Sequence, residues 1–181
     1  MSHIKKRHLY RERDEEKRKK FTDFVNASRK SRLVYVDESG IDEYLHRERA
    51  RAKRGEKIVT EIPGKKFARQ SIVAAKCGKE IIAPFGYDGT CNSELFLWWV
   101  ETMLVPKLKK RQIVIMDNAS IHKRKEIREA IKKAGCHLVY QPPYSPDLNP
   151  IERFWSWLKK KIRSLKQKFD SLADAICYAL S

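Results

Sequence analysis

Three carboxylates that lie far apart in the sequence have the side-chain chemistry of a two-metal centre. Asp37 follows the apolar run 33–36, Asp117 follows the apolar run 113–116, and Glu152 falls in the first turn of an expected helix. Carboxylates that converge from separate elements can hold two divalent ions about 3.5–4 Å apart, which clamp the attacking and leaving oxygens of a phosphodiester. An all-oxygen ligand set favours Mg²⁺, and Mn²⁺ can substitute for it.

Each carboxylate also has a local structural explanation. Asp37 can make a turn with the Ser-Gly pair that follows it, and Asp117 can form an Asx turn that leads into the next helix. Glu152 can close a capping box, because Asn149 is a strong N-cap and Pro150 suits the first helical position. The combination is more specific than any single residue, since the 34 residues at 118–151 hold one expected helix, one strand and one Pro-rich loop.

The elements that must position these residues follow from the apolar periodicity. The expected strands are Leu33–Val36, Gln70–Ala75, Glu80–Ala83, Ile113–Met116 and His137–Tyr140, with Tyr44–Leu45 as a further candidate. The expected helices run from Asn92 or Ser93 to Leu108, from Lys123 to Ala134, from Pro150 to Leu165, and from Asp170 or Ser171 onward. Leading strands followed by strand–helix alternation predict an α/β fold, a mixed sheet flanked by helices on both faces.

Composition points to a polyanionic partner. The 181 residues include 40 Lys and Arg against 23 Asp and Glu, which gives a net charge of +17. Such an excess favours nucleic acid. No run of 18 apolar residues occurs, and the four cysteines lack zinc-site spacing. We therefore expect DNA and no membrane as a partner, buried thiols in a reducing compartment, and a cytoplasmic, chromosome-associated protein.

Several residues near the carboxylates carry secondary hypotheses. His122 either contacts a DNA phosphate, supports the site from behind, or caps a helix locally. Asp147 is interpreted as a turn residue rather than a ligand. Glu38 should point away from Asp37, because side chains alternate along an extended chain. The expected helix after Pro150 carries basic residues and two tryptophans that could follow a DNA backbone: Arg153, Lys159, Lys160, Lys161 and Arg163, with Trp155 and Trp157. A second set on this helix recurs at helical spacing and is assigned mostly to the core: Phe154, Trp157, Leu158 and Ile162.

Three motifs carry a family resemblance that runs from about residue 10 to residue 181. They read Val-Asp-Glu-Ser-Gly at 36–40, Met-Asp-Asn-Ala-Ser-Ile-His at 116–122, and Pro-Pro-Tyr-Ser-Pro-Asp-Leu-Asn-Pro-Ile-Glu at 142–152. The chain resembles the catalytic domain of bacterial transposases in the mariner-like superfamily. That resemblance implies a ribonuclease H-like fold and an Asp-Asp-Glu triad at Asp37, Asp117 and Glu152, which would bind the metal ions and catalyse DNA cleavage and strand transfer at transposon ends.

The resemblance also predicts organisation and partners. Residues 1–30 would be a charged lead-in helix or linker, which either docks on the core or remains a solvated arm, and residues 31–181 would be the DDE catalytic domain. Relatives carry helix-turn-helix domains before this region, so the chain is interpreted as the C-terminal half of a split or truncated transposase. The expected partners are transposon-end and target DNA, an upstream helix-turn-helix chain, and a second copy in a homodimer on DNA.

Two other functions remain open from the sequence. A ribonuclease H-like nuclease or junction resolvase would share the chemistry without strand joining. The intact triad argues against a non-catalytic DNA-binding remnant, whereas the expected lack of helix-turn-helix domains argues for one.

Overall fold

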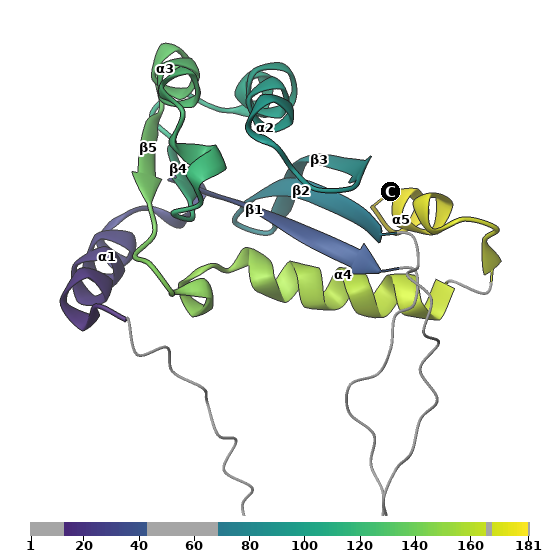
Figure 1. Cartoon of the computed structure of the whole chain (residues 1–181). Coiled ribbons are helices and arrows are strands. Elements are labelled where there is room, and N and C mark those ends of the chain that lie inside the picture. Colours follow the sequence, from purple (N-terminus) through teal and green to yellow (C-terminus); the bar gives the residue numbers. More distant parts are fainter. Residues whose placement is uncertain (1–12, 43–68, 166–167, 181) are drawn as a thin grey trace, which may run out of the picture.

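The sheet places the first two carboxylates on adjacent strands. The computed structural model describes residues 13–42, 69–165 and 168–180, so the candidate strand at Tyr44–Leu45 lies outside the described residues. Five strands pair in the order β3-β2-β1-β4-β5 (Figure 1). Strands β1 (Leu33–Asp42), β2 (Arg69–Cys77) and β3 (Glu80–Asp88) form an antiparallel meander, and β4 (Ile113–Met116) and β5 (His137–Tyr140) run parallel to β1.

Strand β1 is longer than the sequence predicted. The expected turn after Asp37 does not form, because residues 34–42 pair continuously with β2, from Val34 opposite Cys77 to Asp42 opposite Arg69. Pairing with β4 ends earlier, at Tyr35 opposite Ile115. Asp37 therefore lies inside a strand, yet just beyond the point where the neighbouring parallel strand stops. Strand β3 is also longer than predicted, since it runs to Asp88 rather than ending at Ala83.

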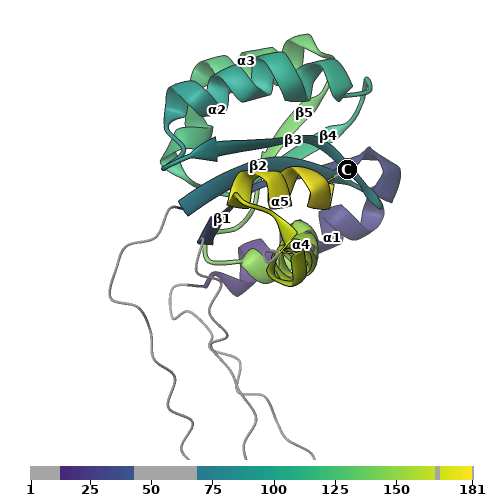
Figure 2. The same cartoon turned by 90° about the vertical axis from the view of Figure 1, so that its right-hand side faces the viewer.

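Helices cover both faces of the sheet, as the element order predicted (Figure 2). On one face, even-numbered residues of β1 such as Val34 and Val36 join a core with Phe96, Trp99 and Ile131. This layer contains α2 (Ser93–Trp99), its π-helical and 3₁₀ continuations (Val100–Leu104 and Val105–Lys107), the 3₁₀ turn η4 (Ser120–Lys123), and α3 (Lys125–Lys133). The predicted start of α2 is confirmed, since Asn92 Oδ1 accepts the N–H groups of residues 94 and 95.

The other face packs against α4 (Ile151–Leu165) and α5 (Leu172–Leu180). The buried stripe of α4 is Ile151, Trp155, Leu158 and Ile162. The predicted core position for Trp157 is wrong, because that side chain is 50% exposed while Trp155 is 3% exposed. The stripe follows a spacing of four, three and four residues, which places Trp155 rather than Trp157 toward the sheet.

A lead-in helix, α1 (Glu15–Ala27), docks on the same face near β4. Phe21 packs with Leu33, Tyr35 and Ile115, and Leu148 from a distant loop joins this cluster. All four thiols are free, and the expected burial holds only in part, since Cys136 is buried and Cys177 is exposed. Among the described residues, none of the helices is long and apolar enough to cross a membrane.

Candidate active site

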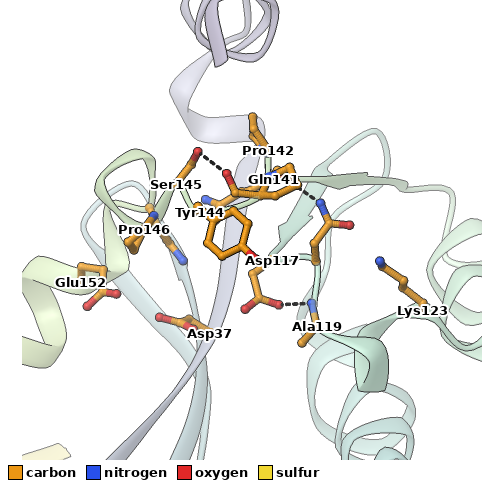
Figure 3. A pocket seen from close by; sticks show the side chains of 13 residues that line it. Asp37, Asp117, Ala119, Lys123, Gln141, Pro142, Tyr144, Ser145, Pro146 and Glu152 are labelled. Carbon is orange, nitrogen blue, oxygen red and sulfur yellow. Dashed lines mark hydrogen bonds between the residues drawn. The ribbon is translucent and has the colours of Figure 1, made fainter. Parts of the chain in front are cut away.

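The three candidate residues line one pocket of about 640 Å³ at the end of the parallel strands. Figure 3 shows Glu152, Asp37 and Asp117 following one another from left to right, with the Tyr144 ring above Asp37 and Asp117. The complete lining is Asp37, Asp117, Asn118, Ala119, Lys123, Gln141, Pro142, Pro143, Tyr144, Ser145, Pro146, Asn149 and Glu152.

Strand β1 delivers Asp37 to the α4 face of the sheet. Its Oδ2 atom accepts a hydrogen bond of 3.0 Å from the indole N–H of Trp155. Burial, and after it the negative charges of Glu38 and Glu152, raise the pKa of Asp37 to about 7. A carboxyl group in this position is poorly solvated and repelled by its neighbours, which is the condition that a bound cation relieves.

Asp117 follows β4 and is held by its own loop. Its Oδ1 atom accepts the Ala119 N–H at 2.8 Å, so the predicted Asx turn is present. The same oxygen lies 2.6 Å from His122 Nδ1, an ion pair whose angle departs from that of a good hydrogen bond. Although burial acts to raise it, the contacts with His122 and Ala119 hold the pKa of Asp117 below its usual value. Asp117 therefore forms its local Asx turn and also lines the pocket.

His122 supports the site from the other face of the sheet. Its ring is 1% exposed, so the hypothesis of contact with a DNA phosphate is wrong. The Nε2 atom lies 2.8 Å from Oε1 of Glu38, which points away from Asp37 as strand alternation predicts. Although burial acts to lower it, the carboxylates of Asp117 and Glu38 raise the pKa of His122 to about 10. The protonated ring thus bridges two strands through their acids.

Glu152 stands at the start of α4 with its carboxylate exposed to the pocket. Asn149 is the N-cap, because its Oδ1 accepts the Ile151 N–H at 3.2 Å. The Asn149 N–H donates to the Pro146 carbonyl instead of to Glu152, so the capping box does not close. Among the described residues, the Glu152 side chain has no hydrogen bond or ion pair. Its carboxylate is consequently available to a ligand in the pocket.

The Pro-rich loop forms the wall above the three acids. Tyr144 adopts a left-handed backbone conformation, with φ of 54°, which is uncommon for a residue with a side chain. Ser145 Oγ donates to the Pro143 carbonyl, and Asn118 Nδ2 donates to the Gln141 carbonyl at 2.7 Å. The Ser145 bond lies within the loop, and the Asn118 bond joins the loop to the residue that follows Asp117.

The donor chemistry of the pocket fits Mg²⁺ or Mn²⁺. All three candidate ligands offer carboxylate oxygens, and the pocket lining contains no cysteine or histidine. Within the described ranges, no three His, Cys, Asp or Glu side chains already lie close enough together to coordinate one ion. Oδ1 of Asp117 already contacts His122 and the Ala119 N–H, so a metal ion placed there would require a small rearrangement of that carboxylate.

The residues that hold the acids in place are not evident from the sequence patterns. The sequence predicts a DNA contact for Trp155, whereas its indole N–H donates to Asp37. The available signal was its place in the buried stripe with Ile151 and Leu158, because a buried indole N–H needs an acceptor. The Glu38–His122 pair spans 84 residues and has no local signal.

The mixed sheet and its flanking helices define a ribonuclease H-like fold. The chain superposes on the Mos1 strand transfer complex with a TM-score of 0.71 at 22% identity, covering 99% of this chain and 58% of that one. It superposes on the catalytic core domain of BIV integrase with a TM-score of 0.51 at 15% identity, covering 83% and 81% of the two chains. At these identities the likeness establishes the fold.

Sequence similarity identifies the family. A family model described as DDE superfamily endonuclease matches residues 32–176, and the chain belongs to that superfamily. It is also 38% identical, over 63 residues, to the Tcb2 transposable element transposase of Caenorhabditis briggsae. That match covers 32% of this chain and 23% of the relative. The chain thus spans well under two thirds of both the transposase and the Mos1 chain that it resembles.

Proposed function

We propose that this chain is the catalytic domain of a DNA transposase, which cleaves DNA at transposon ends and joins those ends to target DNA. Asp37, Asp117 and Glu152 are the proposed catalytic residues, and their carboxylates would hold two Mg²⁺ or Mn²⁺ ions. End recognition is proposed to come from an upstream helix-turn-helix partner, with two copies of the chain acting on paired ends.

One observation carries this proposal: acids from three separate elements line a single pocket in a protein with a net charge of +17. Relatives support the assignment, because Mos1 has been solved in complexes with transposon-end DNA and with Mn or Mg. Burial, and after it the charges of Glu38 and Glu152, raise the pKa of Asp37, which costs stability when the carboxyl ionises. A structural or DNA-coating role does not require a carboxyl in such a position.

The proposed chemistry consists of two in-line displacements. A water oxygen attacks the phosphorus at the element end, the bond from phosphorus to the 3′ oxygen breaks, and the 3′-hydroxyl leaves. That hydroxyl oxygen then attacks a target phosphorus and displaces the target 3′ oxygen. Bound divalent ions would lower the pKa of the attacking oxygen and neutralise charge on the phosphate. Trp155 orients Asp37, His122 orients Asp117, and Lys123 at the pocket edge is proposed to hold a phosphate.

Strand joining separates a transposase from a nuclease with the same fold. We expect the chain, supplied with its partner and Mg²⁺, to join a pre-cleaved 3′-hydroxyl end to plasmid DNA, with products resolved on a sequencing gel. A matched duplex ending in a 3′-deoxy nucleotide is the control and should give no joined product. Metal-dependent nicking without joining would favour the nuclease, and the absence of both activities would favour a DNA-binding remnant.

The exposed side of α4 supplies a path for DNA into the pocket. Arg153, Lys160 and Arg163 are exposed on α4, whose first turn carries Glu152, and Trp157 lies exposed among them. Phosphate contacts of this kind give affinity without sequence information. We therefore expect the chain alone to bind transposon ends and scrambled duplexes almost equally.

A salt titration measures this binding mode. The logarithm of the binding constant should fall with the logarithm of salt concentration, with a slope near −0.9 for each phosphate neutralised. Replacing Lys160 and Arg163 with alanine should reduce the slope by about one per lost contact on every sequence. Alanine at Lys132 and Lys133, exposed on α3 across the sheet, is the matched control. A preference above about 100-fold for the end sequence, roughly 3 kcal/mol, would mean that this domain reads bases itself.

A further inference from the structure

We propose that helix α1 positions Glu152 by holding Asp147 between two arginines, Arg13 and Arg18. We call these three residues the arginine clamp. The inference rests on the proposed function, because Glu152 is taken as a residue of the metal site. It assigns to the lead-in helix a role in arranging the active site, and it makes Arg13, Arg18 and Asp147 positioning residues.

The clamp is a dense, partly buried ion-pair cluster. Arg13 Nη2 lies 3.0 Å from Oδ1 and 3.1 Å from Oδ2 of Asp147. Arg18 donates through Nη1 to Oδ1 at 3.2 Å and through Nη2 to Oδ2 at 2.7 Å. The two arginine side chains are only 12% and 11% exposed. The Arg18 pair is bidentate, with two parallel bonds, and a pair of that type fixes geometry as well as charge.

The surroundings of the clamp reinforce it. Glu15 balances the second positive charge, with carboxylate oxygens 3.9 Å from Arg13 Nε and 3.6 Å from Arg18 Nε. Hydrogen bonds from Arg18, followed by the charges of both arginines, hold the pKa of Asp147 below its usual value. Beside the clamp, Leu148 packs into the apolar cluster that contains Phe21 of α1. The helix therefore grips this loop by both charge and apolar contact.

A short, constrained stretch of chain connects the clamp to Glu152. Asp147 is the middle residue of the 3₁₀ turn η5 (Pro146–Leu148), which is followed directly by the N-cap of α4. The turn is closed by bonds from Leu148 N–H to the Ser145 carbonyl and from Asn149 N–H to the Pro146 carbonyl. The Glu152 N–H then donates to the Asn149 carbonyl. A shift of Asp147 must therefore move the first turn of α4.

A direct role for Asp147 as a metal ligand does not fit the structure. Both of its carboxylate oxygens accept hydrogen bonds from guanidinium groups. The residue is also absent from the pocket lining, although its neighbours Ser145, Pro146 and Asn149 belong to that lining. The remaining alternative is that the clamp only stabilises the fold, and the experiment must separate that role from positioning.

The first measurement does not depend on catalysis. In Asp147→Asn, amide hydrogen exchange at Leu148, Asn149 and Glu152 should become several-fold faster, while exchange in β1 and β4 stays as in the wild type. Asp23→Asn, at an exposed position on α1, is the matched control and should change neither region. Unchanged exchange at residues 148–152 in a folded Asp147→Asn protein would overturn the clamp, whether or not the wild type cleaves DNA.

The second measurement uses metal-dependent cleavage. In Asp147→Asn and Arg18→Ala, the single-turnover rate should fall about 10–100-fold, and the Mg²⁺ concentration for half-maximal rate should rise, with DNA affinity preserved. Arg18→Lys should recover part of the loss. The double variant of Asp147→Asn and Arg18→Ala should lose little more activity than either single variant, since the residues act together.

A wild-type rate and Mg²⁺ dependence in folded Asp147→Asn would contradict the positioning role. If the wild-type protein shows no metal-dependent cleavage, the proposed function is refuted. The hydrogen-exchange measurement then still tests whether the arginine clamp holds residues 148–152.

Discussion

Asp37→Asn, Asp117→Asn and Glu152→Gln should each reduce Mg²⁺-dependent DNA cleavage by at least about 10³-fold. Losing one ligand removes transition-state charge stabilisation of several kcal/mol, and roughly 4 kcal/mol corresponds to that factor. The three residues come from β1, the end of β4 and the start of α4, yet they line the same pocket. The measurement is the single-turnover rate on a labelled duplex, with circular dichroism and thermal unfolding to establish that each variant is folded.

Matched controls separate lost chemistry from lost charge. Asp170→Asn and Glu129→Gln remove one negative charge each at exposed positions away from the pocket, and both should cleave at the wild-type rate. The Glu152 variant is the most informative one, because Asn149 caps α4 without help from the Glu152 carboxylate. Full activity in folded Glu152→Gln would remove that residue from the triad.

Removing divalent metal should abolish cleavage and make the stability of the protein depend on the ionisation of Asp37. EDTA should stop the reaction, Mg²⁺ or Mn²⁺ should restore it, and Ca²⁺ should permit DNA binding with little turnover. The pKa of Asp37 is raised from 3.8 to about 7 in the folded state. The folded protein therefore holds a proton that the unfolded chain has released between about pH 4 and 7, so metal-free stability falls as pH rises through that window.

Thermal unfolding at pH 8 tests the same site without catalysis. Metal-free Asp37→Asn should unfold on the order of 5 °C above metal-free wild type, because it lacks a charge that is buried and also repelled by Glu38 and Glu152. Saturating Mg²⁺ should raise the midpoint of the wild type, since a ligand that binds only the folded state stabilises it, and should raise that of Asp37→Asn much less. At pH 4 the metal-free difference should disappear. Equal midpoints at pH 8, or an equal response to Mg²⁺, would argue against Asp37 as a ligand.

The sequence by itself determined the features that depend on local periodicity and short-range bonds. Short continuous apolar runs marked the strands around Asp37 and Asp117, and Asn92 and Asn149 marked helix starts that the structure has. These signals are reliable because a cap or an amphipathic stripe is satisfied within a few residues. The family motifs added the triad, whose catalytic role remains a prediction.

Only the tertiary structure decided how those features are connected. Strand β1 continues past Asp37 because β2 pairs with it, which outweighs the local turn preference of Ser39 and Gly40. Contacts across 118 residues from Trp155 to Asp37, and across 129 and 134 residues from Arg18 and Arg13 to Asp147, carry no local pattern. Such pairs form when packing brings two distant elements together, so burial and charge at one position depend on residues that sequence spacing does not reveal.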